Sequence, residues 1–522
     1  MHAHPALSLA DDLERNARWH RDDPAYVQGE GIITHGQLLA RALRLGSALH
    51  RAGVRNQDRV GILAMNSLEF AEVVAACQWS GYILSTVNFR LAPAEMAWII
   101  NDAAPKVLFF EAQYGAIIAA LRPQLASVTR FVCLDGGMAW ADSYGQFAAS
   151  GDPEGPPCRA REEDPFCLIY TSGTTGRPKG CLWGHREFRQ LAQLDCWYGG
   201  LEKPDRILIV MPMFHIGGLT LSLSQHVVGG AAHLHRQFDA EAIIRAIEGE
   251  RLTVLLLAPT MVKMVLEHPA IAAADLSSVR TVLYSAAPMA PTLLRRAIEV
   301  FRGCGFVNLF GQTEIVPAAL TALQHRPEGS ERERRRLTSI GQPYPNMDIR
   351  IVDEQGNDCP VGVPGEMLAR GVAMFRGYWN NSVATVETLR NGWVHTGDMA
   401  RVDEDGFIYL VDRKKDVINS GGENIYSREV EEAILQHPAV SECAVIGIAD
   451  ETWGESVCAL VVTREAGGVT ETAIIAHVAS LIASYKKPKK VLFVAELPKL
   501  VTGKVDKKRL RAEYATAGGA RR

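Results

Sequence analysis

Stretches with helical spacing of apolar residues alternate with short, continuous apolar runs before residue 400. Residues 37–52 and 69–80 show the helical spacing, and residues 59–65 and 83–87 form the apolar runs that follow them. A short apolar run next to a helix is typical of a strand buried on both faces. The alternation therefore predicts βαβ units and parallel sheets.

Three further apolar runs, at residues 166–170, 207–214 and 252–259, are predicted to be buried strands. None approaches the ~20 residues that a helix needs to cross a bilayer. We therefore expect no transmembrane segment.

From residue 415 onward the pattern changes. Residues 428–436 and 472–483 are predicted helices, and residues 443–448, 457–463 and 491–494 are predicted strands. This mixed order of short elements predicts a small α+β domain.

The length of 522 residues exceeds what one hydrophobic core usually supports. We predict an α/β N-terminal domain of parallel sheets flanked by helices at residues 1–414. The small α+β C-terminal domain then occupies residues 415–522. Two segments are expected to be loops, the G-D-P-E-G-P-P run at 151–157 and the run of interleaved arginines and glutamates at 325–336.

Composition narrows the class of protein. Hydrophobic residues make up 47% and charged residues 22%, as in ordinary globular proteins, and the net charge of -4 gives no reason to expect a nucleic-acid partner. None of the ten cysteines forms a C-x-x-C pair, which argues against zinc and against a dithiol redox site. Residues 1–20 contain acidic side chains and no apolar core, unlike a signal peptide. We expect a cytoplasmic protein with reduced thiols.

The sharpest local signal lies directly after the predicted strand at 166–170. Residues 171–180 read T-S-G-T-T-G-R-P-K-G. Glycines and short hydroxyl side chains let backbone N–H groups approach a polyphosphate, and a lysine adds positive charge. The spacing does not match G-x-x-x-x-G-K-[ST], which disfavours a P-loop NTPase. The predicted polyphosphate loop comprises Thr171, Ser172, Gly173, Thr174, Thr175, Gly176 and Lys179.

Eight further motifs follow this loop along the chain. They are M-P-M-F-H at 211–215, Y-S-A-A-P at 284–288, F-G-Q-T-E at 310–314, G-E-M-L-A-R-G at 365–371, W-V-H-T-G-D at 393–398, D-R-K-K-D at 412–416, S-G-G-E-N at 420–424 and P-K-L-V-T-G-K at 498–504. In this order they resemble the adenylate-forming superfamily: acyl-CoA synthetases, firefly-type luciferases and the adenylation domains of peptide synthetases. The resemblance covers nearly the whole chain and is strongest to bacterial fatty-acyl-CoA and related carboxylic acid–CoA ligases.

The resemblance implies a site for ATP and Mg²⁺. Glu314 matches the family's metal-binding glutamate, Thr313 touches the phosphate, and Thr171 is a second residue beside the metal. Phe310 stands where most relatives have tyrosine, and its ring face suffices for stacking on adenine. The other nucleotide contacts implied are Ser285, Ala286, Ala287, Asn308, Gly311 and Gln312.

Two further residues match the family's ribose contacts. Asp398 resembles the aspartate that accepts hydrogen bonds from both ribose hydroxyls, and Arg413 resembles the arginine that also reaches the ribose. A surface salt bridge between the two is the alternative.

The C-terminal motifs imply two successive reactions. Lys504 resembles the lysine that bridges the acyl carboxylate and the α-phosphate, a task that suits a compact charge on a long stem. In the family the C-terminal domain then rotates about a residue that aligns with Lys415, and Gly421 and Gly422 flank the channel for coenzyme A. The segment 498–504 also resembles sequences that lysine acetyltransferases modify, which makes such an enzyme a candidate partner at Lys504.

The predicted acyl pocket lacks a fixed charge. His215 resembles the residue that closes one wall around the acyl carbonyl, although a histidine satisfied in the core is the alternative. The other lining residues are Met213, Phe214, Gly218 and Ile315. Because an amino acid or a dicarboxylate would need a charged partner, an apolar monocarboxylic acid is favoured. A fatty acid comes first, and an aryl or alicyclic acid next.

The main prediction is an AMP-forming acid–CoA ligase. One alternative is a stand-alone adenylating enzyme that loads a carrier protein, and another is an oxygenase of luciferase type. A non-catalytic binding protein is disfavoured, because Glu314, Asp398 and Lys504 are all present. A homodimer stays open.

Overall fold

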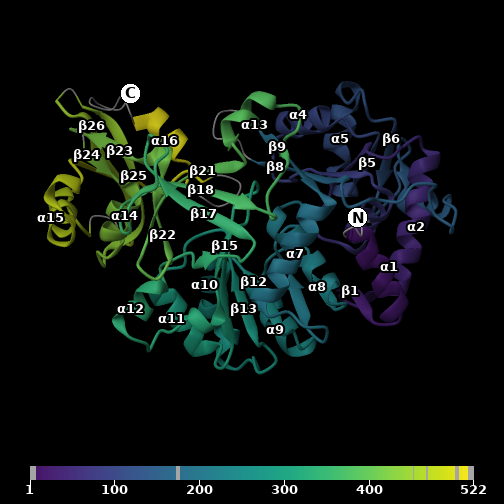
Figure 1. The fold of residues 1–522 in the computed structure, drawn as a ribbon, viewed down its shortest axis with the longest axis horizontal. Coiled ribbons are helices and arrows are strands. Elements are labelled where there is room, and N and C mark those ends of the chain that lie inside the picture. The colour runs from purple at the N-terminus through teal and green to yellow at the C-terminus, as the bar shows by residue number, and fades with distance from the viewer. Residues whose placement is uncertain are drawn as a thin grey trace, which may run out of the picture. The chain divides into compact units, whose positions relative to one another are not determined.

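The computed structural model describes residues 7–171, 177–421, 423–450, 452–465, 468–499 and 505–514. The chain forms two compact units (Figure 1). The first comprises Met1–Ile349 and Ala369–Val394, and the second comprises Arg350–Leu368 and His395–Arg522. The boundaries of these compact units do not coincide with residue 414. The domain boundary and hinge expected there stay a prediction.

The first unit contains a nine-stranded sheet. Its order is β16 (Gln342–Pro343), β15 (Ala318–Leu320), β14 (Gly305–Phe310), β13 (Thr281–Tyr284), β12 (Val254–Leu257), β10 (Arg206–Ile209), β11 (Ala231–Leu234), β1 (Pro24–Gln28) and β2 (Gly31–Thr34). The six strands from β14 to β1 run parallel, and the strands at both ends run antiparallel.

An eight-stranded sheet forms the second layer of this unit. Its order is β19 (Gly377–Tyr378), β9 (Lys179–Gly184), β8 (Pro165–Thr171), β4 (Ile83–Thr86), β3 (Arg59–Leu63), β5 (Val107–Phe110), β6 (Arg130–Cys133) and β7 (Asp142–Ser143). The strands from β8 to β7 are parallel, whereas β9 and β19 are antiparallel additions at one edge.

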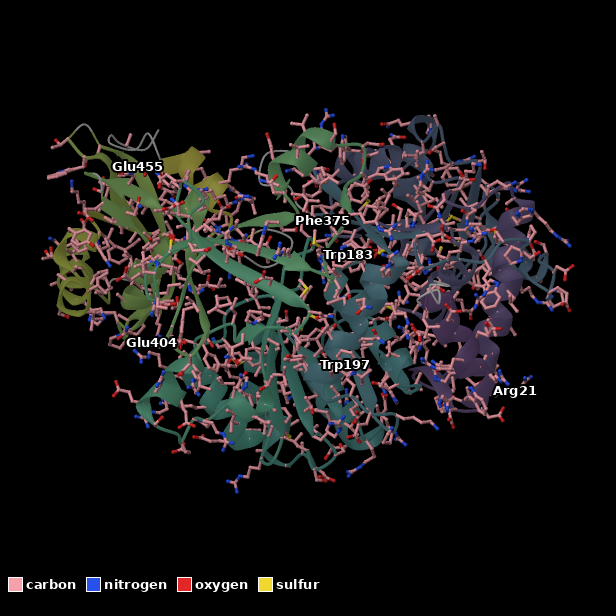
Figure 2. The ribbon with its side chains drawn as sticks, viewed as in Figure 1. Arg21, Trp183, Trp197, Phe375, Glu404 and Glu455 are labelled. Atoms are coloured by element: carbon pink, nitrogen blue, oxygen red, sulfur yellow. The ribbon has the colours of Figure 1, made fainter. Side chains whose placement is uncertain are left out.

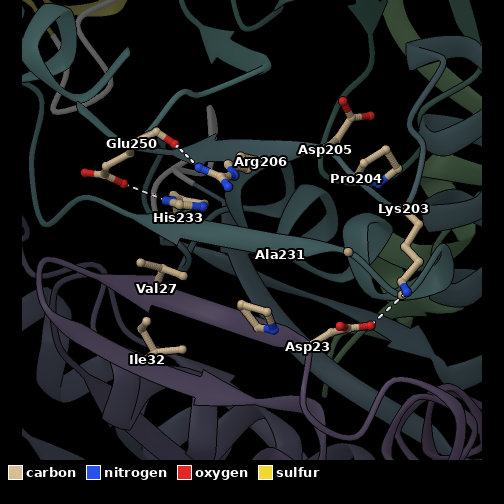
Figure 3. A pocket seen from close by; sticks show the side chains of 13 residues that line it. Asp23, Val27, Ile32, Lys203, Pro204, Asp205, Arg206, Ala231, His233 and Glu250 are labelled. Carbon is tan, nitrogen blue, oxygen red and sulfur yellow. Dashed lines mark hydrogen bonds and ion pairs between the residues drawn. The ribbon is translucent and has the colours of Figure 1, made fainter. Parts of the chain in front are cut away.

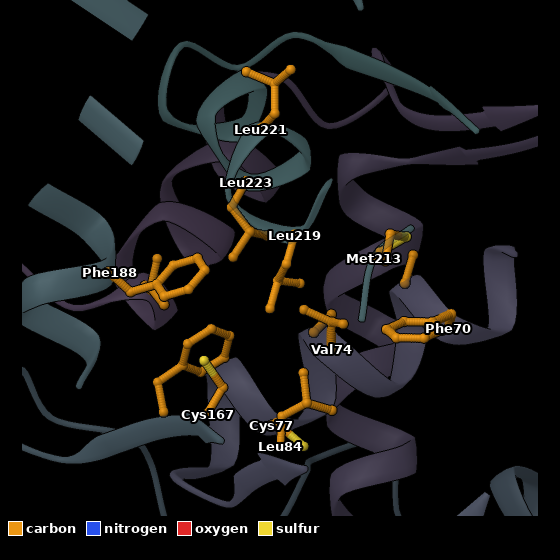
Figure 4. Close-up of a cluster of buried hydrophobic side chains, with 14 of the residues drawn as sticks. Phe70, Val74, Cys77, Leu84, Cys167, Phe188, Met213, Leu219, Leu221 and Leu223 are labelled. Atoms are coloured by element: carbon orange, nitrogen blue, oxygen red, sulfur yellow. The ribbon is translucent and has the colours of Figure 1, made fainter. Parts of the chain in front are cut away.

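Helices connect and cover these strands. They are α1 (Leu9–Trp19), α2 (His35–Arg51), α3 (Leu68–Ser80), α4 (Pro93–Ala103), α5 (Gly115–Leu121), α6 (Tyr144–Ala149), α7 (His185–Gly199), α8 (Ile216–Val227), α9 (Ala240–Gly249), α10 (Pro259–Glu267), α11 (Pro291–Val300), α12 (Glu331–Arg336) and α13 (Ser382–Thr388). Residues from both sheets and from α3, α7 and α8 share one buried cluster (Figure 4). Phe70, Phe188 and Leu219 represent the three helices in it.

A five-stranded sheet contains the points where the chain passes between the units. Its order is β17 (Met347–Val352), β18 (Gly365–Gly371), β21 (Trp393–Val402) and β20 (Leu389–Arg390), with β22 (Ile408–Arg413) on β21. The last sheet, wholly in the second unit, has the order β24 (Glu423–Ile425), β23 (Ile418–Ser420), β26 (Gly454–Thr463) and β25 (Val440–Asp450), with β27 (Lys490–Phe493) on β26. Its helices are α14 (Ser427–Leu435), α15 (Glu471–Leu481) and α16 (Lys507–Tyr514).

The predicted fold class, a large parallel-sheet region followed by a small α+β region, is confirmed. The loop predicted at 325–336 is wrong in part, because residues 331–336 form α12. Ser330 and Glu333 form a capping box at the start of this helix. The prediction considered only the mixed charges of the segment and overlooked this helix-start motif. The predicted strand at 207–214 ends at Ile209, and α16 was not predicted. Within the described residues, no helix is long and apolar enough to cross a membrane.

Candidate active site

The predicted adenine contacts meet at the carboxyl ends of two neighbouring strands. In the parallel pair β13–β14, Tyr284 lies opposite Asn308, so residues 285–287 leave the sheet beside residues 308–312. Ligands of open α/β sheets bind at this end of the strands. The structure therefore brings together the predicted contacts from two motifs.

The loop after β13 has an unusual backbone. Ala286 has a φ of 73°, a left-handed conformation that residues other than glycine seldom adopt. Such strain persists only where the surrounding structure holds it, and it is common at functional sites. Directly before the loop, the Tyr284 hydroxyl lies 2.9 Å from His325 Nε2, and His325 Nδ1 lies 2.8 Å from the Thr321 carbonyl oxygen. Burial lowers the pKa of His325 to about 4, so it is neutral at physiological pH.

The predicted polyphosphate loop begins on β8 and ends on β9, where Thr171 lies opposite Lys179. Ser172, Gly173, Thr174, Thr175 and Gly176 lie outside the described residues. Lys179 Nζ lies 4.9 Å from the centre of the Tyr378 ring, within range of a cation–π contact.

Thr313 and Glu314 are held by residues that sequence reasoning missed. The Trp183 indole donates to the Thr313 carbonyl oxygen (2.9 Å), and the Tyr378 hydroxyl donates to Glu314 Oε1 (2.6 Å). The Phe375 N–H donates to the Glu314 carbonyl oxygen (2.8 Å). Trp183 and Phe375 are among the residues labelled in Figure 2. Burial and the neighbouring Glu314 raise the pKa of Tyr378, which keeps its hydroxyl protonated as a donor.

The side chains around Glu314 suit a magnesium ion that arrives with ATP. Among the described residues, no three His, Cys, Asp or Glu side chains gather into a cluster that could hold a metal. Magnesium usually takes one or two carboxylates together with substrate phosphates and water. A single carboxylate oriented by a hydrogen bond from Tyr378 fits that donor set.

The M-P-M-F-H segment between β10 and α8 is fixed by a buried amide. Asn66 Nδ2 donates to the carbonyl oxygens of Met211 and His235 (both 3.1 Å), and Asn66 Oδ1 accepts from the Met213 N–H (2.8 Å). Thr86 Oγ1 donates to the Phe214 carbonyl oxygen (3.0 Å). Because these bonds engage the backbone of residues 211–214, β10 cannot continue there.

Three of the predicted acyl-pocket residues, Met213, Phe214 and His215, lie within this segment. Met213, Phe214 and Ile315 are buried, whereas His215 is half-buried at the N-cap of α8. At Gly218, a Cβ atom would lie 2.4 Å from the Pro212 carbonyl oxygen, so only glycine lets α8 pack against the segment. Met213 shares the buried cluster with Phe70 (Figure 4). Lining of an acyl pocket by these residues stays a prediction.

In the second unit, the predicted ribose contacts are paired with each other. Asp398 on β21 lies opposite Arg413 on β22, and Arg413 Nε lies 2.8 Å from Asp398 Oδ1. Asp398 is buried and the Arg413 side chain is 44% exposed. The ion pair therefore exists, and a ribose role for the same two residues stays a prediction.

The segment after β22 carries the predicted hinge. Lys415 is the middle residue of a 3₁₀ turn, Lys414–Asp416. Both neighbouring residues form ion pairs: Lys414 pairs with Glu366 (2.8 Å), and Asp416 pairs with Arg511 (2.6 Å). Burial lowers the pKa of Lys415.

Gly421 begins the turn between β23 and β24. It has a φ of 66°, and a Cβ atom there would lie 2.5 Å from the Trp453 ring. Gly422 and Lys504 lie outside the described residues.

A cavity of about 550 Å³ lies elsewhere in the first unit (Figure 3). It opens at the amino ends of β1, β10 and β11, near Pro24, Arg206 and Ala231. Two ion pairs line it, Asp23–Lys203 (2.8 Å) and Glu250–His233 (2.5 Å). The residues that line it include none of the predicted site residues, so this cavity is not the predicted site.

Parallel sheets with these motifs in order define an adenylate-forming enzyme. The chain belongs to the AMP-binding enzyme family: the model of that family matches residues 13–379, and the model of its C-terminal domain matches residues 429–504. The predicted enzyme class, an AMP-forming acid–thiol ligase, is confirmed by this family together with the CoA ligases among the relatives.

Similar proteins cover the chain almost completely. Indoleacetate–CoA ligase of Aromatoleum aromaticum is 35% identical over 97% of this chain and 98% of its own length. The medium/long-chain fatty acid–CoA ligase FadD8 of Mycobacterium tuberculosis is 33% identical over 96% and 89%. The fatty acid–[acyl-carrier-protein] ligase ScoC of Streptomyces coeruleorubidus is 32% identical over 98% and 97%.

Among solved structures, the amide bond synthetase McbA from Marinactinospora thermotolerans matches with a TM-score of 0.87. It is 30% identical, over 97% of this chain and 99% of that chain. By name, these relatives therefore include ligases for coenzyme A and for an acyl-carrier protein, and an amide bond synthetase.

Proposed function

We propose that the chain is an ATP-dependent carboxylic acid–CoA ligase acting on an apolar monocarboxylic acid. In the first reaction a carboxylate oxygen attacks the α-phosphorus of ATP, and the bond from that phosphorus to pyrophosphate breaks. In the second, the sulfur of coenzyme A attacks the acyl carbonyl carbon, the bond to AMP breaks, and the thiol proton is released.

The observation that carries the proposal is the meeting of two motifs at one side chain. Lys179, from the polyphosphate hairpin, and Glu314, from the motif that follows β14, both contact Tyr378. A cation for the phosphates and a carboxylate for the metal are thus held within reach of one another. Both reactants are anions, so catalysis depends on such fixed charges.

The remaining roles follow from residue chemistry. Phe310 stacks on adenine, Asp398 and Arg413 bind the ribose, and Lys504 bridges the two reacting anions. Glu314 and Thr171 would hold Mg²⁺, which would neutralise charge on the phosphates.

Two features favour coenzyme A as the acceptor. Indoleacetate–CoA ligase and FadD8 use it by name, and the Gly421 turn presents bare backbone beside the half-exposed Trp453 ring. A chain as narrow as pantetheine passes such backbone closely. We propose that the C-terminal domain rotates about Lys415 between the two reactions, which removes Lys504 and admits the thiol.

For the acid, the buried side chains of Met213, Phe214 and Ile315 offer apolar contact without a charge. The relatives named above act on both aryl and fatty acids, so both classes are proposed, with the fatty acid first.

The test is a panel of carboxylic acids assayed for AMP release with and without coenzyme A. It should hold medium- and long-chain fatty acids, arylacetates and cinnamates, with malonate and an amino acid as controls. We expect AMP and an acyl-CoA to accumulate together with one or more apolar acids. Adenylate that coenzyme A never discharges, with discharge only on a carrier protein, would contradict the proposed acceptor.

A further inference from the structure

Tyr378 contacts both Lys179 and Glu314. Its hydroxyl donates to Glu314 Oε1 at 2.6 Å, and its ring centre lies 4.9 Å from Lys179 Nζ. Within the described part of the chain, Lys179 and Glu314 form no ion pair, and each contacts Tyr378 instead. A cation and an anion therefore face one neutral phenol and are not joined to each other.

We propose that Tyr378 is a positioning residue that orients the Glu314 carboxylate for Mg²⁺ and keeps it from pairing with Lys179. This inference rests on the proposed function of Glu314 as the metal-binding residue. An outer partner that hydrogen-bonds a metal-ligating carboxylate fixes its orientation, and its loss typically lowers metal affinity or activity 10–100-fold.

The chemistry of a phenol suits both tasks. A neutral donor leaves the full negative charge of Glu314 available to the metal, whereas a lysine or arginine in the same place would neutralise it. The ring face attracts the Lys179 ammonium without removing its charge. Both charges therefore stay available, one for the phosphates and one for the metal.

Tyr378 is itself held firmly. Its strand β19 pairs with β9, where Tyr378 lies opposite Cys181. Its N–H donates to Thr385 Oγ1 (2.9 Å), and its ring packs edge-to-face on Phe375 at 5.0 Å. The Phe375 N–H also donates to the Glu314 carbonyl oxygen (2.8 Å). Phe375 therefore contacts both residues and helps to fix the Tyr378 phenol relative to Glu314.

The test compares ATP binding with and without Mg²⁺ by isothermal titration calorimetry on the full chain. Tyr378→Phe removes the hydroxyl and keeps the ring. We expect it to lose ~10-fold of the Mg²⁺-dependent gain in ATP affinity, while binding without Mg²⁺ is unchanged. Tyr378→Leu also removes the ring, so Lys179 and Glu314 can pair, and ATP binding should weaken even without Mg²⁺.

Tyr82→Phe is the matched control. The Tyr82 hydroxyl is buried and donates to the Gly46 carbonyl oxygen (3.1 Å), away from the site. It should lower the melting temperature about as much as Tyr378→Phe and leave the Mg²⁺ effect intact. A Tyr378→Phe variant with the wild-type Mg²⁺ effect would overturn the inference.

Glu314→Gln separates this inference from the proposed function. If Glu314→Gln abolishes the Mg²⁺ effect and Tyr378→Phe does not, only the role of Tyr378 is refuted. If Glu314→Gln retains the Mg²⁺ effect, the metal-binding role of Glu314 itself is wrong.

Discussion

The two compact units hold their predicted site residues in different ways. In the first unit, the residues that fix the site are buried: Asn66 and Thr86 are each 2% exposed and Trp183 is fully buried. In the second unit, the predicted ribose contacts form an ion pair in which Asp398 is buried and the Arg413 side chain is 44% exposed.

This difference matters for a reaction in two steps. A packed core does not deform continuously, so backbone held by buried hydrogen bonds keeps one geometry through both steps. Ion pairs at partly exposed sites contribute only ~0–1 kcal/mol and are easily exchanged for others. The first unit is therefore suited to hold the nucleotide, and the second to change partners between the steps.

The largest expected effect comes from restricting the predicted hinge. Proline at residue 415 would fix φ there and restrict Lys414 as well, so Lys415→Pro should favour one orientation. We expect one half-reaction to slow by roughly 100-fold, the scale at which small misplacements reduce rates, while the other survives. Adenylate formation and acyl transfer from a pre-made adenylate should be timed separately.

Lys415→Ala is the control for this variant, because it removes the side chain and keeps the torsional freedom. It should leave both half-reactions near the wild-type rate. Unchanged rates in Lys415→Pro would remove the hinge assignment.

A smaller effect should follow from loosening the first unit at Asn66. Asn66→Ala leaves the Met213 N–H and the carbonyl oxygens of Met211 and His235 without this partner, which costs ~1–3 kcal/mol of stability. We also expect the KM for the acid to rise by roughly 10-fold, with the KM for ATP unchanged, because the displaced segment carries His215.

Gln225→Ala supplies the comparison. This buried amide donates to the carbonyl oxygens of Glu202 and Asp205, far along α8 from His215. It should destabilise the chain similarly and spare the KM for the acid. If both variants raise the KM for the acid equally, the claim that Asn66 positions the acid-binding segment is wrong.

The smallest effect concerns a buried carboxyl in the same unit. Asp195 on α7 is 5% exposed, its Oδ1 has no described partner, and burial raises its pKa to about 8. The folded state therefore binds more protons than the unfolded state between about pH 4 and pH 8, and stability falls as pH rises through that window.

An asparagine side chain does not titrate in this range, so Asp195→Asn should gain stability relative to wild type as pH rises. We expect a gain of ~1–3 kcal/mol from pH 5 to pH 8, measured by denaturant unfolding of both proteins. An equal difference at both pH values would mean that Asp195 is not held neutral in this way.

The sequence predicts the fold well where signals are local. Alternating helices and apolar runs predicted the parallel sheets, and the order of motifs placed Ser285 and Asn308 in one site, which the β13–β14 pairing supports. Both inferences depend on periodicity and motif order, which are visible along the chain.

Contacts between distant positions escaped prediction. Tyr378 and Glu314 are 64 residues apart, and the pairing of β19 with β9 and of residues 373–375 with residues 314–316 brings them together. The end of β10 was also missed, because it depends on an amide from residue 66 that bonds to residues 211 and 213. Such contacts follow from tertiary structure and leave no spacing pattern in the sequence.

The central claim, that charged groups of the C-terminal domain serve one half-reaction and leave for the other, is tested most directly at Lys504. The two half-reactions should be measured separately on wild type, on Lys504→Ala and on Lys499→Ala, a neighbouring lysine paired on the surface with Glu442. The account predicts that Lys504→Ala slows adenylation by ~100-fold or more, the scale of removing one transition-state stabiliser. Acyl transfer from a pre-made adenylate should be spared, and Lys499→Ala should affect neither step. Equal slowing of both half-reactions by Lys504→Ala would contradict the account.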